Sequence, residues 1–168
     1  IGFWNFKRAP GFFDVVCYTF TGGTTTFNHN LGVAPELVIT KERNRSFDWY
    51  SWGTVLGANK YITLNSGAPA TAYTFGTTVT TTTFRDDIAT SNQPKVAYLF
   101  ATLAGISKVG SYTGNGTSQT INCGFAAGAR FILIKRTDST GDWKVIDSAS
   151  GIVAGNDPTL ALNSTAAE

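Results

Sequence analysis

The sequence is poor in the residues that most often carry chemistry. It has no methionine, one histidine (His29) and two cysteines (Cys17 and Cys123), and charged residues make up only 14% of its 168 positions. A lone histidine between two asparagines is typical of a turn, and no grouping of histidine, cysteine and carboxylate has the spacing of a zinc, iron or calcium site. We therefore expect no catalytic residue, no metal and no cofactor, and so no enzyme.

The two cysteines do not form a repeated pair. When the two similar halves of the chain are aligned as set out below, Cys17 falls opposite Ser111 and Cys123 opposite His29. A disulfide belonging to each half would need a pair in each copy. We predict two free thiols on strands, acting as small apolar side chains.

Net charge is also small, because 13 basic residues are nearly balanced by 11 acidic ones, leaving +2. Binding to nucleic acid usually needs a clustered basic stripe, and these basic residues are dispersed. The longest apolar stretch, Val96–Ile106, is about half the length that spans a bilayer. We expect no nucleic acid partner and no membrane insertion. A sparsely charged, threonine-rich surface suits a subunit covered by neighbours in an oligomer or particle, with a plain monomeric β domain as the alternative.

What the sequence does contain is an internal repeat. Residues 11–49 align without a gap with residues 105–143, and ten positions are identical. The identical pairs are Gly11/Gly105, Val15/Val109, Tyr18/Tyr112, Thr19/Thr113, Gly22/Gly116, Thr26/Thr120, Asn28/Asn122, Lys41/Lys135, Asp48/Asp142 and Trp49/Trp143. So long a period fits duplication of a small domain better than a solenoid. We predict an aromatic lead-in arm or linker at 1–10, a first module at 11–104 and a second module at 105–168.

The second copy is shorter than the first. The first copy continues after Asn65 through Thr71–Phe84 and Lys95–Ala101, whereas the second reaches Glu168, the equivalent of Ala70. A module without its last strands leaves open sheet edges. Because the chain also starts at an isoleucine and has no methionine, we expect it to be the middle of a longer polypeptide.

Abundant threonine and glycine favour short strands and tight turns over helices. Gly22-Gly23 and Asn115-Gly116 lie between β-branched runs, which is typical of hairpins. The strands that we expect are Val15–Thr21, Thr24–Asn28, Glu36–Lys41, Lys60–Asn65, Thr77–Phe84, Lys95–Ala101, Val109–Thr113, Thr117–Asn122, Arg130–Lys135 and Thr159–Asn163, with returning strands at Asp48–Tyr50 and Asp142–Lys144. This pattern predicts an all-β fold of two tandem homologous antiparallel β-sandwich or barrel-like modules, the second truncated.

A lysine followed by an Asp-Trp pair recurs in both copies. It has two interpretations: a hairpin end with the indole packed on the sheet, or an indole platform for a sugar with the charged groups bonding hydroxyls. We favour the structural interpretation, because shared positions are usually module core. Trp4 and Trp52 have no counterpart and are freer to be exposed. The candidate surface-binding residues are Trp4, Trp49, Trp52, Trp143, Lys41, Asp48, Lys135 and Asp142.

Four stretches carry a family resemblance: Trp4–Val16, Asn28–Leu37, Val96–Gly105 and Phe131–Trp143. Through them the chain resembles a duplicated module found near the C-terminal ends of large structural proteins of tailed bacteriophages, especially marine ones. There it often follows a jelly-roll, lectin-like domain in tail-fibre or other virion proteins. The resemblance covers nearly the whole chain and implies an exposed, oligomeric virion component, with trimers common among phage fibres. It supplies no catalytic residues.

Three functional hypotheses follow. The first is a phage virion structural protein, a tail-fibre or receptor-binding segment whose weak contacts are multiplied by several copies. Its partners would be other virion proteins, copies of itself in a homotrimer, and a host-surface glycan. The alternative is a capsid decoration or connector protein with a purely architectural role. The third, a polysaccharide-degrading tailspike, needs facing carboxylates, to be sought among Asp86, Asp87, Asp138, Asp142 and Asp147.

Overall fold

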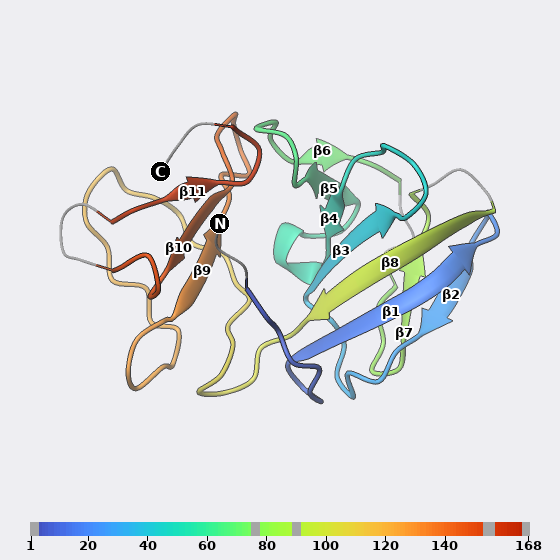
Figure 1. Cartoon of the computed structure of the whole chain (residues 1–168), viewed down its shortest axis with the longest axis horizontal. Coiled ribbons are helices and arrows are strands. Elements are labelled where there is room, and N and C mark those ends of the chain that lie inside the picture. The colour runs from blue at the N-terminus through green and yellow to red at the C-terminus, as the bar shows by residue number, and fades with distance from the viewer. Residues whose placement is uncertain (1–3, 75–77, 89–91, 153–156, 166–168) are drawn as a thin grey trace.

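The computed structural model, which describes residues 4–74, 78–88, 92–152 and 157–165, consists of short strands joined by turns and irregular chain (Figure 1). Residues 1–3 of the predicted arm, Thr77 of a predicted strand and 166–168 of the second module lie outside this part. In order, the elements are β1 (Phe13–Phe20), β2 (Thr25–Asn28), β3 (Leu37–Glu42), β4 (Tyr50–Trp52), a 3₁₀ turn (Thr54–Leu56), β5 (Lys60–Thr63), β6 (Thr71–Ala72), β7 (Thr83–Asp86), β8 (Gln93–Phe100), β9 (Phe131–Ile134), β10 (Lys144–Asp147) and β11 (Leu160–Ala161). The predicted all-β fold of antiparallel sheets is confirmed.

The main sheet has six strands in the order β1-β8-β3-β4-β5-β6. β8 lies between β1 and β3 and pairs with β1 along its full length, from Phe100 opposite Phe13 to Gln93 opposite Phe20. Because side chains alternate between the two faces of a strand, Lys95, Ala97 and Leu99 of β8 are buried on one face. That face carries the core of the first half.

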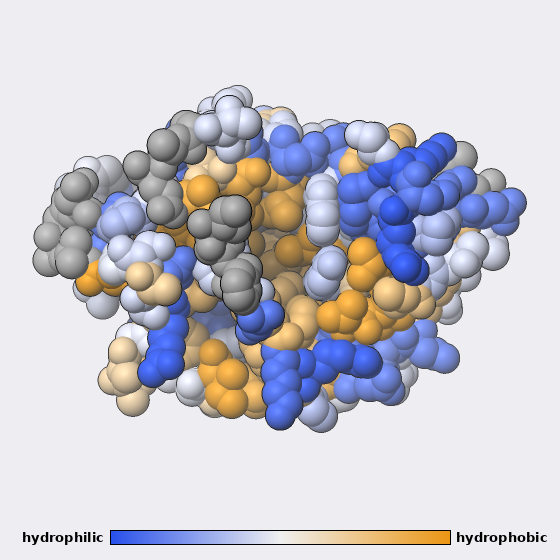
Figure 2. Space-filling view, in the orientation of Figure 1, coloured by the Kyte–Doolittle hydropathy of each residue, from blue (hydrophilic) through white to orange (hydrophobic). Residues whose placement is uncertain are grey.

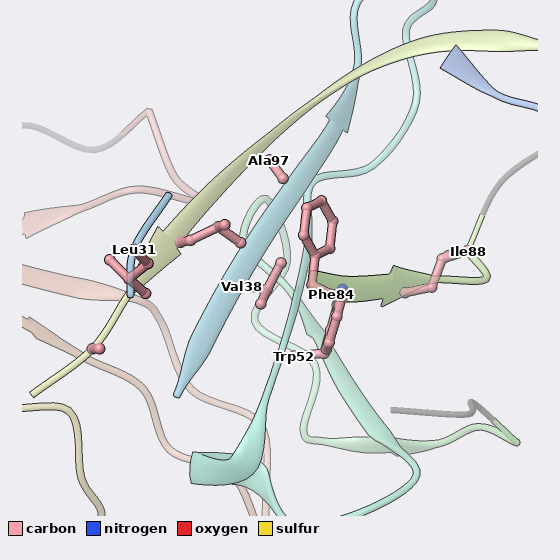
Figure 3. Close-up of a cluster of buried hydrophobic side chains, with 8 residues drawn as sticks. Leu31, Val38, Trp52, Phe84, Ile88 and Ala97 are labelled. Carbon is pink, nitrogen blue, oxygen red and sulfur yellow. The ribbon is translucent and has the colours of Figure 1, made fainter. Parts of the chain in front are cut away.

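A two-stranded ribbon of β2 and β7 covers this face of the main sheet. Phe84 of β7 and Trp52 of β4 meet in the middle of the enclosed core and are 0% and 1% exposed (Figure 3). The rest of the cluster is Leu31, Val38, Ile88, Ala97, Leu99 and Ala101. Within the described ranges the main sheet is open, with β1 and β6 at its edges, so the first half is a small sandwich and no barrel closes.

A separate three-stranded sheet, ordered β11-β10-β9, forms the second half. Its register repeats that of β3, β4 and β5: Val38 lies opposite Trp52, and the equivalent Ile132 lies opposite Ile146. The β4–β5 and β10–β11 pairings correspond in the same way. The duplication and the module boundaries remain predictions.

Two predicted strands are wrong. Val109–Thr113 and Thr117–Asn122 lie in an irregular and mostly exposed segment. Their counterparts β1 and β2 are strands because they pair with β8 and β7, whereas within the described residues β9 pairs with β10 alone. Cys123, also predicted on a strand, lies in the same irregular region, while Cys17 lies exposed on β1; both thiols are free, as predicted.

The N-terminal arm links the two halves. The Phe6 ring centroid lies 5.6 Å from that of Phe13 on β1 and 5.4 Å from that of Phe131 on β9. Trp4 packs edge-on against Phe131 at 5.6 Å, and its Nε1 donates a hydrogen bond to Asp147 Oδ2 at 2.9 Å. Figure 2 shows hydrophobic residues gathered in the middle of this face, between the halves. The described part of the lead-in segment is therefore an extended arm.

Candidate binding surface

The repeated Asp-Trp pair is held by an asparagine in each half. In the first half the Asn65 side chain accepts a hydrogen bond from the Trp49 backbone N–H at 3.0 Å and donates one to Asp48 Oδ1 at 2.8 Å. Asn163 makes the same two bonds to the equivalent tryptophan and aspartate, at 2.8 and 2.9 Å. In both halves the pair thus ties the start of one strand to the end of the next.

The repeated lysines bind backbone carbonyl oxygens. Lys41 Nζ donates to the oxygens of Glu42 and Arg45, at 2.6 and 2.7 Å. Lys135 Nζ reaches across to the first half and donates to Gly67 O at 3.1 Å. Both lysines are therefore bound to backbone carbonyl oxygens near the ends of their hairpins.

Two of the four tryptophans cannot serve as a surface platform. Trp52 and Trp143 are 1% and 5% exposed, so their selection as surface-binding candidates is wrong. Trp52 fills the core beneath the ribbon, and Trp143 is covered by the first half, where its Nε1 donates to Thr63 O at 2.8 Å. Trp49 is half-buried, with its ring stacked 6.1 Å from that of Tyr98.

The eight candidates do not gather at one place. Lys41, Asp48 and Trp49 lie at one end of the β3–β4 hairpin, and their counterparts lie at the same end of the β9–β10 hairpin. Trp4 is 36% exposed but belongs to the arm that packs on β9. We call each hydrogen-bonded group of asparagine, aspartate and tryptophan a turn bracket. The predicted site is therefore two separate turn brackets, one in each half, and a contact made by the arm.

The carboxylates that a tailspike would need are each bound by another group. Their partners are Lys95 for Asp86, Arg85 for Asp87, Arg136 for Asp138, Asn163 for Asp142, and Trp4 and Ser150 for Asp147. Asp86 is the last residue of β7. Across residues 4–74, 78–88, 92–152 and 157–165, no group of three or more histidine, cysteine and acidic side chains could hold a metal ion.

His29 lies in irregular chain directly after β2. It is 5% exposed, and its Nδ1 accepts a hydrogen bond from the Leu31 backbone N–H at 3.1 Å. Its Nε2 lies 3.2 Å from Thr80 O. The imidazole therefore braces the chain after β2.

A row of four aromatic side chains follows the rim of the first half and forms a better candidate surface. Ring centroids are 6.2 Å apart for Phe47 and Tyr50, 5.3 Å for Tyr50 and Tyr61, and 5.9 Å for Tyr61 and Tyr73. The two outer rings, Phe47 and Tyr73, are 41% and 42% exposed, while the inner two pack on the core. We call these four residues the aromatic row. Strands β4 and β5 hold its centre rigidly.

Charged groups border one end of the aromatic row. The Arg45 guanidinium lies 5.3 Å from the centroid of the Phe47 ring, a cation–π geometry. Burial, followed by the Asp48 carboxylate, raises the pKa of Tyr50, so its hydroxyl stays protonated and able to donate. This end therefore offers an aromatic face beside a fixed cation.

At the other end, a shallow hollow opens beside Tyr73. It is lined by Asn59, Ala72, Tyr73 and Thr74, which supply an amide, a hydroxyl and a phenol around one small apolar side chain. Aromatic faces suit the apolar C–H faces of sugars, and nearby polar groups set the orientation of the bound molecule. The composition of the row and hollow fits a carbohydrate better than a charged or purely apolar ligand.

The sequence argument missed the aromatic row because it ranked tryptophan first and followed the repeat. The row is not repeated: Gly141, Lys144 and Thr159 stand at the positions equivalent to its first three members. A usable signal was present, since its three tyrosines are spaced eleven and twelve residues apart. That is about one strand and one turn in an all-β domain, which brings residues onto neighbouring strands.

No helix among the described residues is long and apolar enough to cross a membrane.

Comparison with known proteins gives one match. No curated protein and no solved structure matches the chain. A family profile described as a domain of unknown function, DUF7483, matches residues 8–168, almost the entire sequence. The chain therefore belongs to the DUF7483 family of domains of unknown function.

Proposed function

We propose that this chain is a structural segment of a phage virion, a tail-fibre or receptor-binding element, and that its aromatic row contacts a host-surface glycan. The resemblance in sequence supports the virion setting. The observation that carries the binding role is the aromatic row, with exposed rings at both ends and a polar hollow beside Tyr73. The role is binding rather than catalysis, with no cofactor.

Binding through such a surface would be weak for one copy and strong for several. A ring stacked on a sugar contributes about 1 kcal/mol, and displaying three copies on one particle multiplies the effective affinity. A homotrimer on the outside of the virion therefore suits the proposal. Light scattering of the purified chain measures that state, and a strictly monomeric chain in every condition would count against it.

The binding test is a glycan array probed with the chain in multivalent form. We expect F47A and Y73A together to lower binding about tenfold or more, because each change removes a stacking face. Y112A is the matched control, since Tyr112 is 53% exposed in the second half, away from the row. Equal loss in the control, or no loss in the double variant, would contradict the role of the aromatic row.

The setting is tested separately, by imaging phage particles at a resolution that traces this chain. Density at the outer end of a tail fibre agrees with receptor binding. Density across the capsid shell or inside a tail joint would replace it with an architectural role.

One observation favours that architectural role as the second candidate. Three apolar residues of the irregular segment, Ile106, Tyr112 and Ile121, are 60%, 53% and 46% exposed. A neighbouring subunit or virion protein could bury them, as expected of a decoration or connector protein. Protection of these side chains on assembly, without glycan binding, would favour this candidate.

A further inference from the structure

A lysine and an aspartate are buried in direct contact between the main sheet and the β2–β7 ribbon. Lys95 Nζ of β8 touches Asp86 Oδ2 of β7, and the side chains are 1% and 0% exposed. Lys95 Nζ also donates to Ile88 O at 2.7 Å. Removing two charges from water costs several kcal/mol each, which their attraction repays only in part. A plain ion pair is thus an expensive choice for this core.

The groups around the pair are arranged for more than charge balance. The Tyr18 hydroxyl donates to the same Asp86 oxygen at 2.5 Å, and the Phe20 ring centroid lies 5.8 Å from Lys95 Nζ. Burial, followed by the Asp86 carboxylate, raises the pKa of Tyr18 well above its usual range, so this phenol remains a donor. The pair therefore lies in an apolar, aromatic site with one hydroxyl fixed on the carboxyl group.

A second carboxylate flanks the lysine. Tyr18 on β1 and Glu42 on β3 are the residues directly across from Lys95 on β8, so all three side chains project from the same face of the sheet. Glu42 is 3% exposed; its Oε2 accepts a hydrogen bond from Arg45, and its buried Oε1 accepts none from the described residues. Glu42 therefore offers a buried carboxylate oxygen that can still accept a hydrogen bond, and this residue lies directly across from the lysine.

We propose that Lys95 and Asp86 join in an intramolecular isopeptide bond between Nζ and Cγ. The lysine ammonium first gives a proton to the aspartate, leaving a neutral amine and a carboxylic acid. The amine attacks Cγ and the N–C bond forms; the C–OH bond then breaks, and the hydroxyl takes a second proton from Nζ and leaves as water. One amide and one water replace the pair, with no change in oxidation state.

The surrounding residues supply what this step needs. Fixed contact between the Lys95 Nζ and the Asp86 carboxyl group removes the entropy cost of bringing them together, and a lysine without its hydration shell is a better nucleophile. The Tyr18 hydroxyl stabilises the negative oxygen of the tetrahedral intermediate. Glu42 carries the proton from Nζ to the departing hydroxyl once its Oε1, which has no hydrogen-bond partner among the described residues, turns toward Nζ. The product covalently fastens the ribbon to the main sheet.

Mass spectrometry of the unaltered chain tests the proposal. The denatured protein should be lighter than its sequence by one water, about 18 Da. Trypsin does not cut after a lysine whose Nζ is in an amide. The bonded chain should therefore yield the uncut stretch Asp86–Lys108, one water lighter, with no backbone fragments from inside the Asp86–Lys95 loop. Release of separate Asp86–Lys95 and Val96–Lys108 peptides at full mass would overturn the proposal.

Substitutions assign the bond to this pair. K95R keeps a positive charge but cannot form the amide, so its mass should match its sequence; K60R, at an exposed lysine of β5, should keep the loss of water. E42Q should leave a larger fraction uncrosslinked at early times after synthesis. If K95R does not fold, the tryptic digest of the unaltered chain still decides. Loss of water that persists in K95R would place the dehydration elsewhere and refute the assignment.

Discussion

Strands β3–β4–β5 and β9–β10–β11 share order, register and turn brackets, yet the two halves differ in what surrounds them. In the first half β8 pairs with β3 and β1 pairs with β8, and the ribbon of β2 and β7 closes the core. In the second half, within the described ranges, β9 has β10 as its one paired neighbour. A shared three-stranded unit therefore supports one complete sandwich and, among the described residues, one three-stranded sheet without a covering ribbon.

Residues common to both halves show what the missing neighbour costs. Tyr18 is bonded to Asp86 beside the core, whereas its equivalent, Tyr112, is 53% exposed. Phe27 packs on the core, whereas its equivalent, Ile121, is 46% exposed. Similar local sequence thus gives a strand in one place and irregular chain in the other. A partner strand, more than intrinsic propensity, decides whether such segments become β structure.

The largest difference should appear in amide hydrogen exchange. We expect backbone amides of β1 and β8 to exchange about a thousandfold or more slowly than those of 107–122, because the former open only when the core opens. Exchange followed residue by residue by NMR measures this directly. Comparable protection in both segments would mean that 107–122 pairs with another strand in solution.

Next in size is the effect of removing an equivalent side chain from each hairpin. Trp52 is 1% exposed, so W52A should lower the free energy of unfolding by about 3–5 kcal/mol. Ile146, its half-buried equivalent on β10, should cost about 2 kcal/mol or less in I146A. Urea denaturation followed by far-ultraviolet circular dichroism gives both values. Equal losses would show that the second half has a core as tight as the first.

The turn brackets should behave alike in the two halves. N65A and N163A each remove a side chain that makes the same two hydrogen bonds, so each should lower stability by about 1 kcal/mol. Thermal unfolding compares them, with N44A as a control in an exposed loop. A large loss in one variant alone would contradict the structural equivalence of the brackets.

The smallest effect is expected from acid. Burial acts to raise the pKa of Asp14, but hydrogen bonds from the backbone of Asn30, from Arg8 and from the backbone of Val15 outweigh it and leave the pKa lowered. A carboxyl whose folded pKa is lowered contributes stability that is present above its unfolded value, about 3.9, and is lost as pH falls through the folded value. D14N should therefore unfold more readily at pH 7 and show a flatter loss of stability below pH 4.

Asp147 gives the matched comparison in the second half. A hydrogen bond from the Ser150 backbone, then one from the Trp4 indole, lowers the pKa of Asp147. Like Asp14, it therefore contributes stability that is lost as the pH falls. D147N should likewise make the loss of stability below pH 4 less steep. An unchanged acidic limb in both variants would show that neither carboxylate is held in its charged form by the fold.

Much of the fold could be predicted from the sequence because local patterns reflect it. Gly22-Gly23 marked the turn after β1, and the apolar run after Pro35 marked β3, which lies inside the main sheet. The equivalent hairpin around Asn115-Gly116 was also predicted and is absent from this part of the structure. Its residues have the propensity for strands, but β pairing depends on a distant segment that no local window contains.

The candidate surface was harder to predict than the fold. The repeat directed attention to Trp49 and Trp143, whose shared environment turned out to be a structural bracket. The aromatic row depends on which residues β4, β5 and the chain after β6 bring to one rim, and that follows from strand order. Burial of Trp52 likewise depends on the ribbon that covers it.

The arm has a mechanical consequence. β1 enters the first half and β8 leaves it at the same end of their pair, where Phe13 lies opposite Phe100. Tension applied between the two ends of the first half would therefore unzip the pair one hydrogen bond after another, which resists force far less than shearing all bonds together. Phe6 packs against both residues at that end. The β1–β8 pair can begin to separate only when the Phe6 ring leaves Phe13 and Phe100. The force needed to open the first half would therefore be set by the release of this ring.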